Sequence, residues 1–390
     1  MAGLPTTAIV NAAVVLPAEV LEGGCVLIRD GVLDHVGTPD SRVADADITV
    51  DAEGGYVLPG LVDLHVHGAL GDSFNIPSAR AWSTVFEAHL GAGTTTLLAT
   101  LASDPVQALR AAMAAGRQLP PPDRRPEGVH LEGPYLSEEQ RGAHPARLLR
   151  KPSDGSWRDF LDDTDLLRMI TVAPELPGSG ELITAFRAAG VVVSAGHSTA
   201  GVEVLDRAAA AGLSHVAHLW SAQSTLRRMP RRYPGLLEAA LSSDTLTAEI
   251  IADGAHLTSE LVRIAFRCLG PDRLCLISDA SAGTGLPVGA EFSMGGPVGV
   301  VGDGVALNHD GASFCGSTSF LADVLRFTVR SAGIPLPAAV RMATATPAAV
   351  LGLAGVTGRL AQGLRADLLV LGRDLALRRV MRRGAWIPGR

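Results

Sequence analysis

Lysine is almost absent from this 390-residue chain. Lys151 is the only lysine, and all the other residues among the 33 lysines and arginines are arginine. Charged residues make up only 19% of the chain and aromatic residues 4%, whereas 47% are hydrophobic. That composition excludes a disordered protein. The formal charge of −7 excludes the basic surface on which nucleic-acid binding depends, so no nucleic-acid partner is expected.

Long apolar runs and paired cysteines are also missing. No run approaches the roughly 18 apolar residues that a membrane span requires. The amino-terminal segment lacks the basic stretch of a signal peptide. The four cysteines are scattered and form no Cys-X-X-Cys pair, which is typical of reduced thiols. We therefore expect a cytoplasmic protein without a membrane partner.

The two ends of the chain resemble each other. Residues 1–57 contain short alternating segments separated by Gly, Asp and Pro, a pattern typical of antiparallel strands with tight turns. The closing stretch, 363–386, has the same character, so the small domain is expected to comprise residues 1–57 and 357–390. We predict that both ends together form one small β-sandwich domain.

The middle of the chain, 58–356, alternates short apolar runs with helical stretches rich in Ala and Leu. Continuously apolar strands alternating with helices indicate a parallel sheet covered on both faces. Eight such units predict an α/β fold, a TIM-like (β/α)8 barrel, with a doubly wound sheet as the alternative. The predicted strands cover residues 61–67, 94–100, 128–132, 169–173, 191–196, 215–219, 247–252 and 274–279.

Polar residues end several of these strands, and the carboxyl ends of barrel strands surround the active site. They are His65, His67, Glu132, His197, His218 and Asp279. His65 and His67 are two residues apart, so both imidazoles face the same side of the strand. Imidazole and carboxylate groups suit zinc, iron, manganese or cobalt rather than calcium. We expect one or two divalent metal ions that activate water and polarise a carbonyl, the chemistry of amide or ester hydrolysis.

Several motifs together resemble the N-acetylglucosamine-6-phosphate deacetylases of the amidohydrolase superfamily, and the resemblance extends over nearly the whole chain. The motifs are PGLVDLHVHG (59–68), HLEGPYL (130–136), RGAHP (141–145), SAGHS (194–198), HVAHL (215–219), IIADGAH (250–256), LISDA (276–280), ATATPA (343–348) and GRLAQGLRADLLVL (358–371). The resemblance implies that a metal-bound hydroxide attacks the acetamide of N-acetylglucosamine 6-phosphate. Asp279 would act as general acid and base, and the products would be glucosamine 6-phosphate and acetate.

The resemblance also assigns roles to individual residues. Glu132, His197 and His218 match the metal ligands of the family, and His65 with His67 matches an additional pair that permits a second ion. His144 matches a catalytic histidine that helps to polarise the acetyl carbonyl. The implied substrate contacts are Ala143, Ser221, Ala222, Arg232, Asp253, His256, Phe314, Cys315 and Gly316. In this family the arginine that reaches the phosphate often comes from the partner subunit, which implies a homodimer.

Related enzymes with other substrates have catalytic or metal-binding residues that this chain lacks. Dihydroorotases and hydantoinases bridge two metals with a carboxylated lysine on a strand, whereas Lys151 lies in a loop-like segment. The segment GHSTAG (196–201) lacks the glutamate of an adenosine-deaminase-like enzyme. A barrel that binds metal without catalysis remains a further alternative, which the presence of Asp279 beside a full ligand set disfavours.

The departures from the family pattern concern the substrate. The sixth strand continues as HLWSAQ (218–223), in which Ser221 and Gln223 replace the usual Asn and Met. Four arginines lie between residues 227 and 232, so the one that meets phosphate stays open. The alternative substrates are N-acetylgalactosamine 6-phosphate and an unphosphorylated N-acyl amino sugar.

Overall fold

The computed structural model describes residues 4–119, 124–229, 231–293, 298–308 and 313–388. Its centre is a barrel of eight parallel strands, each paired with the next in sequence. A parallel bridge between Val66 and Ala280 joins the first strand to the segment that follows the last. The predicted (β/α)8 architecture is therefore confirmed. The strands are β6 (Leu61–Val66), β9 (Thr94–Ala102), β10 (Gly128–Glu132), β11 (Leu167–Val172), β12 (Val192–Ala195), β13 (His215–Val216), β14 (Thr247–Ile250) and β15 (Leu274–Leu276).

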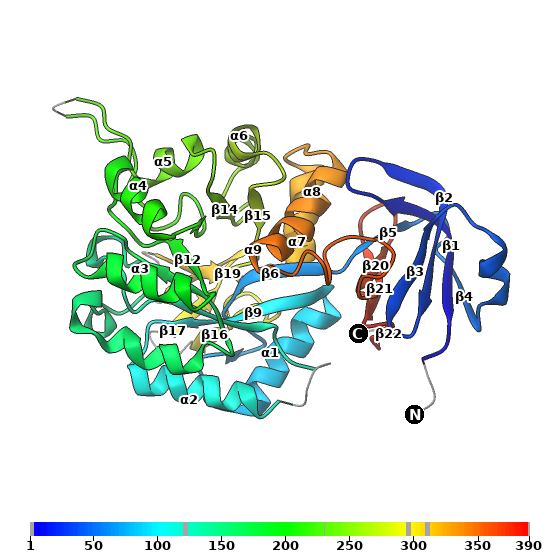
Figure 1. Ribbon diagram of the computed structural model, residues 1–390, viewed down its shortest axis with the longest axis horizontal. Helices are drawn as coiled ribbons and strands as arrows, with labels where there is room; N and C mark the ends of the chain where they lie inside the picture. The colour runs from blue at the N-terminus through cyan, green and yellow to red at the C-terminus, as the bar shows by residue number, and fades with distance from the viewer. Residues whose placement is uncertain (1–3, 120–123, 230, 294–297, 309–312, 389–390) are drawn as a thin grey trace.

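Helices cover the outside of the barrel (Figure 1). They are α1 (Ala79–Gly91), α2 (Val106–Arg117), α3 (Ser179–Ala188), α4 (Val202–Ala211), α5 (Leu236–Ser242), α6 (Ser259–Leu269), α7 (Leu321–Arg330), α8 (Leu336–Met342) and α9 (Ala345–Val350). In α6, for example, Val262, Ala265 and Leu269 are buried, which is the spacing of one helix face against the barrel. Within the described part of the chain, no helix combines the length and apolar character that a membrane span requires.

Both ends of the chain build the small domain at the right of Figure 1. Its sheet has the order β22-β21-β20-β5-β1-β2-β3, and β4 pairs with β1. Strand β20 from the carboxyl end lies antiparallel to β5 from the amino end, which ties the two termini together. The strands are β1 (Thr7–Val15), β2 (Val20–Arg29), β3 (Val32–Gly37), β4 (Ile48–Asp51), β5 (Tyr56–Pro59), β20 (Leu368–Leu371), β21 (Leu377–Arg382) and β22 (Ala385–Trp386).

Apolar side chains from the two ends form a separate core in this domain, including Ile9, Val26, Leu368 and Met381. The small domain of the predicted fold is therefore present. The division of the chain after residues 57 and 356 stays a prediction.

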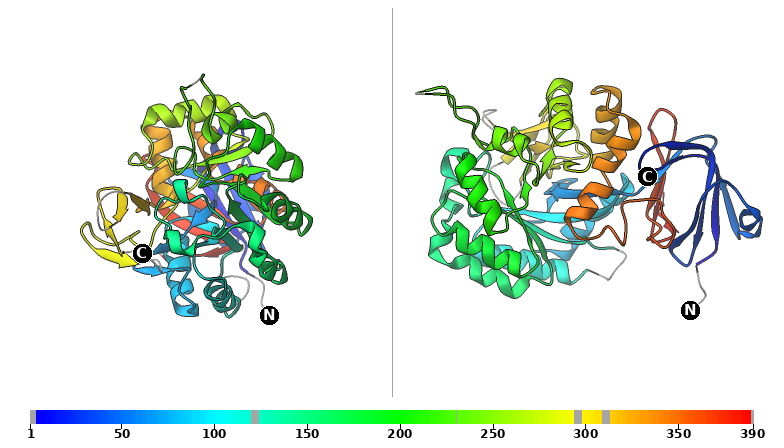
Figure 2. Two further views of the ribbon diagram at one scale, coloured as in Figure 1. Left: turned by 90° about the vertical axis from the view of Figure 1, so that its left-hand side faces the viewer. Right: turned by 45° about the horizontal axis from the view of Figure 1, so that its top comes forward.

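A four-stranded antiparallel sheet follows the last barrel strand, and the sequence did not indicate it. Its order is β16-β17-β18-β19. It lies to one side of the barrel in the left view of Figure 2. A parallel bridge between Ala280 and Ser317 fastens it beside the end of the last barrel strand. The strands are β16 (Glu291–Ser293), β17 (Val298–Val301), β18 (Val305–Asn308) and β19 (Phe314–Ser317).

Candidate active site

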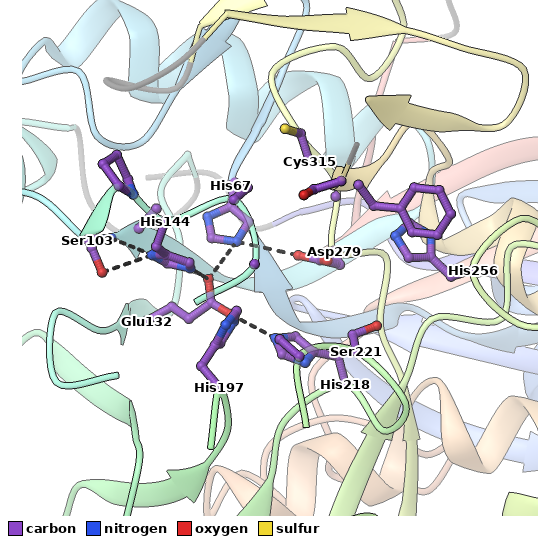
Figure 3. Close-up of a pocket in the computed structure, with 18 of the residues that line it drawn as sticks. His67, Ser103, Glu132, His144, His197, His218, Ser221, His256, Asp279 and Cys315 are labelled. Atoms are coloured by element: carbon purple, nitrogen blue, oxygen red, sulfur yellow. Dashed lines mark hydrogen bonds and ion pairs between the residues drawn. The ribbon is translucent and has the colours of Figure 1, made fainter. Parts of the chain in front are cut away.

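Glu132, the last residue of β10, lies at the centre of a buried cluster at the carboxyl ends of the barrel strands (Figure 3). Its Oε1 atom is 2.8 Å from His218 Nε2 and 2.9 Å from His197 Nε2. The same oxygen is 3.3 Å from His65 Nε2, and Oε2 is 3.3 Å from His67 Nε2. Four predicted histidines from three different strand ends therefore converge on one carboxylate.

Asp279 completes the predicted set. Its Oδ1 atom is 3.4 Å from His67 Nε2 and 3.6 Å from His65 Nε2. The backbone of Asp279 has a φ of 47°, and its N–H donates to the His65 carbonyl while its own carbonyl accepts from the Ser317 N–H. His197 has a similar φ of 48°. Left-handed backbone at two non-glycine residues is strained and persists only where the surroundings hold it, which is common at functional sites.

Burial and charge oppose each other in the cluster. Burial raises the pKa of Glu132, but the charge of His65 foremost, together with the hydrogen bond from His144, outweighs burial and holds that pKa well below its usual range. Burial also raises the pKa of Asp279, and the charges and hydrogen bonds of His65 and His67 again outweigh it, so that pKa is lowered. Burial lowers the pKa of His197 to about 4. Both carboxylates are therefore ionised, and His197 is neutral, at neutral pH.

The donor set fits a divalent metal. His65 Nε2 is buried and has no hydrogen-bond partner in the described structure, although it faces Glu132 and Asp279. His197 Nδ1 is 2.9 Å from the Gln140 carbonyl, which can only accept, so the hydrogen is on Nδ1 and the Nε2 lone pair faces the cluster. Ligand atoms within 4.8 Å of one another form three groups: His65, His67 and Asp279; His65, Glu132 and His218; and Glu132, His144 and His197. Imidazole nitrogens and carboxylate oxygens in this arrangement suit a transition-metal ion.

His144 lies beside the cluster in a fixed orientation. Its Nδ1 accepts a hydrogen bond from the Ser103 N–H at 3.2 Å, and the Ser103 hydroxyl is 2.8 Å from the same nitrogen. The hydrogen of the neutral ring is then on Nε2, which is 3.1 Å from Glu132 Oε2. Gly133 leaves the room for this contact, because a Cβ atom there would be 2.3 Å from Ser103 Oγ. His144 therefore presents a donor toward the cluster.

A cavity of about 300 Å³ opens onto the cluster. The volume is at the lower end of the range for small-molecule sites. The predicted substrate contacts that line it are Ala143, Ser221, Ala222, His256, Phe314, Cys315 and Gly316. The four-stranded antiparallel sheet that follows the barrel supplies three of these residues, since Phe314 to Gly316 belong to its strand β19.

Two predicted substrate contacts do not line this cavity. Asp253 lies behind His256, with its Oδ2 2.7 Å from His256 Nδ1, and it also accepts a hydrogen bond from the Ser317 hydroxyl. Asp253 therefore orients a residue that lines the cavity. Arg232 is exposed, and the described residues around it, 225–229 and 231–234, extend away from the barrel at the upper left of Figure 1. Arg232 is not among the described residues that line the cavity.

Sequence reasoning missed several residues at the site. Ser103 follows the end of β9, the same position that identified the other polar residues, so strand-end reasoning could have found it. Glu249 lies inside β14 and contacts His65 Nδ1 at 3.1 Å. A glutamate within an apolar strand was the available signal. Lys151 is exposed at the start of the short 3-10 helix Pro152–Asp154, in agreement with the loop predicted for it.

Comparison with known proteins agrees with this geometry. The model of the amidohydrolase family matches residues 56–387. The N-acetylgalactosamine-6-phosphate deacetylase of Shewanella sp. (strain ANA-3) is 31% identical, over 95% of this chain and 95% of its own length. The N-acetylglucosamine-6-phosphate deacetylase of Vibrio furnissii is 31% identical, over 86% of this chain and 82% of that protein.

A solved structure extends the likeness to three dimensions. It shows a mutant of the N-acetyl-D-glucosamine-6-phosphate deacetylase from Mycobacterium smegmatis in complex with N-acetyl-D-glucosamine-6-phosphate. That chain superposes with a TM-score of 0.89 at 35% sequence identity, covering 98% of this chain and 99% of the other. The fold, the strand-end cluster and these matches lead to one conclusion: this chain belongs to the amidohydrolase family.

Proposed function

We propose that this chain hydrolyses the acetamide of N-acetylglucosamine 6-phosphate to glucosamine 6-phosphate and acetate. The observation that carries the proposal is the convergence of Glu132, the histidines and Asp279 beside a cavity of about 300 Å³. The relatives named as deacetylases of amino-sugar 6-phosphates support the substrate class.

The proposed cofactor is one or two divalent metal ions, zinc in the first place, with iron, manganese or cobalt as alternatives. The proposed ligands are His65, His67, Glu132, His197, His218 and Asp279. When bound, such an ion lowers the pKa of water and polarises a carbonyl oxygen.

Asp279 is the proposed general base and acid. Its carboxylate accepts the proton of the attacking water and then gives that proton to the amide nitrogen as the C–N bond breaks. The lowered pKa of Asp279 supports the first role, because the group is ionised at neutral pH. His144 donates the Nε2 hydrogen to the oxygen of the acetyl carbonyl, where negative charge develops.

The residues around the cavity would bind the sugar. Ala143, Ser221 and Ala222 lie on one set of loops, and Phe314, Cys315 and Gly316 lie on β19. His256 would face the phosphate, held by Asp253. Arg232 would reach the phosphate in the cavity of a second subunit, since it is exposed and away from its own cavity. The proposal therefore includes a homodimer.

N-acetylgalactosamine 6-phosphate is the second candidate substrate. The observation that favours it is the Shewanella relative, which carries that name and matches 95% of this chain. An unphosphorylated sugar is the third, because the described lining of the cavity includes no lysine or arginine.

The proposal places the enzyme in the cytoplasm, which its four free cysteines support. It also divides the chain into a small domain of residues 1–57 and 357–390 and a hydrolase barrel of residues 58–356.

Acetate release by the purified, metal-analysed protein tests the function. We expect rapid release from N-acetylglucosamine 6-phosphate and slow release from N-acetylglucosamine, with N-acetylgalactosamine 6-phosphate assayed beside them. Faster release from the galacto sugar would transfer the proposal to that epimer. No release from any of the three, with metal bound, would refute it.

A further inference from the structure

Glu249 is a fully buried carboxylate inside the barrel, on the side of His65 opposite the cavity cluster. A buried carboxylate must have its lone pairs satisfied by donors. Oε2 is 3.1 Å from His65 Nδ1, and Oε1 is 3.1 Å from His215 Nε2. Oε2 also accepts from the backbone N–H of His218 at 3.4 Å. One carboxylate therefore contacts two proposed metal ligands, His65 through its ring and His218 through its backbone.

The network determines where the ring hydrogens are. An ionised carboxylate only accepts, so His65 Nδ1 and His215 Nε2 must both carry hydrogen. The remaining nitrogen of His215, Nδ1, is 2.6 Å from the Thr247 hydroxyl, and that hydroxyl also lies 3.2 Å from the Ser214 carbonyl. Both oxygens of Glu249 and both ring nitrogens of His215 therefore have partners.

The consequence for His65 is specific. With hydrogen on Nδ1, Nε2 is the nitrogen that would offer its lone pair to a metal ion, and it faces Glu132 at 3.3 Å and Asp279 at 3.6 Å. That same Nε2 is the buried atom without a hydrogen-bond partner. A ligand histidine whose other nitrogen donates to a carboxylate is held in orientation and is made a stronger base.

His65 and His197 are supported differently. His197 donates its Nδ1 hydrogen to the carbonyl of Gln140, a neutral acceptor, whereas His65 donates to a full negative charge. His218 Nδ1 and His67 Nδ1 have no hydrogen-bond partner among the described residues. In the described part of the ligand set, the ring of His65 alone is backed by a carboxylate outside the cluster.

We propose that Glu249 is a positioning residue that holds His65 as a ligand for the divalent cation, together with His215 and Thr247 behind it. The proposal rests on the metal dependence in the proposed function. It assigns roles to three residues that do not line the cavity: Glu249, His215 and Thr247.

Zinc affinity of the Glu249→Gln variant tests the proposal. Dissociation constants are measured without substrate, by competition with a chelator, and Co²⁺ absorption reports the geometry around the ion. We expect affinity to fall about 10- to 100-fold, with a changed Co²⁺ spectrum. Asp367→Asn is the matched control, because Asp367 is a buried, hydrogen-bonded carboxylate of the small domain and its loss should leave zinc affinity unchanged.

A double-mutant cycle separates positioning from general stability. In a His65→Ala background, Glu249→Gln should change zinc affinity by less than about twofold, because the residue through which it acts is gone. An equal loss of affinity in both backgrounds would overturn the proposal, as would unchanged affinity and spectrum in Glu249→Gln alone. Metal binding is measured without sugar, so a wrong substrate would change neither result. A wild-type protein that binds no divalent cation would overturn this proposal and the proposed function together.

The wild-type protein provides a second test that no unstable variant can obscure. Nitrogen NMR of the zinc-loaded protein, with its histidines labelled, identifies the protonated nitrogen of each ring. His65 should carry hydrogen on Nδ1 and none on Nε2. Hydrogen on Nε2 of His65 would overturn the proposal.

Discussion

Two regions of this molecule are rich in charged or titratable side chains, and they differ in how those side chains are held. The cluster around Glu132 is buried, and the contacts of its histidines with Glu132 and Asp279 range from 2.8 to 3.6 Å. Residues 225–229 and 231–234 expose their arginines to solvent. The described contacts of those arginine side chains are few: Arg227 reaches the Thr199 carbonyl and Arg231 lies over the Tyr233 ring. The difference separates two tasks. Bond cleavage needs groups fixed in a low-dielectric interior, and the strand ends of a single chain supply them. Attraction of an anion needs only positive charge at a surface.

Removal of the metal should have the largest effect and should act on the cluster alone. Treatment with a chelator should abolish acetate release and lower the melting temperature, because the carboxylates and histidines lose the ion that holds them together. Activity assays and thermal unfolding before and after the addition of zinc measure both. The same treatment of an Arg232→Ala variant should give the same loss. Full activity in a chelated sample with no detectable metal would contradict the prediction.

Asp279→Asn should lower kcat by about 10²- to 10⁴-fold, because the variant cannot carry the proton from water to nitrogen. Metal content should stay close to that of the wild-type protein, since His65, His67, Glu132 and the remaining ligands are intact. Steady-state kinetics and metal analysis give the two values. Asp244→Asn, an exposed position, is the control. Turnover at the wild-type rate would remove Asp279 from the mechanism.

Arg232→Ala should raise KM for the phosphorylated sugar about 10- to 100-fold and leave kcat unchanged, since a charged hydrogen bond to phosphate is lost. Hydrolysis of the unphosphorylated sugar should not change. Arg228→Ala serves as a control from the same exposed segment. A larger KM effect for Arg228 than for Arg232 would move the phosphate contact to that residue. If KM is the same in both arginine variants as in the wild-type protein, the exposed segment takes no part in binding the phosphate.

Ser103→Ala should have the smallest effect, a decrease in kcat of at most about tenfold with unchanged metal content. The variant loses the hydroxyl contact to His144 Nδ1 but keeps the backbone N–H that determines the tautomer. Ser194→Ala is a matched control, because the Ser194 hydroxyl is buried and has no hydrogen-bond partner in the described structure. A decrease of a thousandfold would mean that the serine hydroxyl itself takes part in the reaction.

Much of the fold could be predicted because its signals are local. Each barrel strand is a short apolar run, and the helices between them have one buried face, so composition along the chain reveals both. The inserted sheet escaped prediction because its strands have only three or four residues and glycine interrupts them at Gly299 and Gly316. Such runs are too short to distinguish from loops.

The candidate site divides in the same way. His65, His67 and Asp279 could be found because each ends or follows an apolar run, and the barrel architecture brings such ends together. Glu249 could not be connected with His65, which is 184 residues away. That contact depends on the register of β14 against its neighbours and on the rotation of each strand about its axis. Neither the register nor the rotation of a strand can be deduced from the residues that neighbour it in the sequence.

By itself, the sequence determined the eight-unit barrel, the residue types at its strand ends and the absence of a lysine that could bridge two metals. Only the tertiary structure decided which nitrogen of each histidine faces the cluster, that Ser103 and Glu249 orient two of those rings, and that Arg232 lies away from its own cavity. The physical reason is the separation along the chain of the residues that interact. Strand and helix signals come from neighbouring residues, whereas the orientation of a buried imidazole depends on acceptors that strand pairing brings from distant parts of the chain.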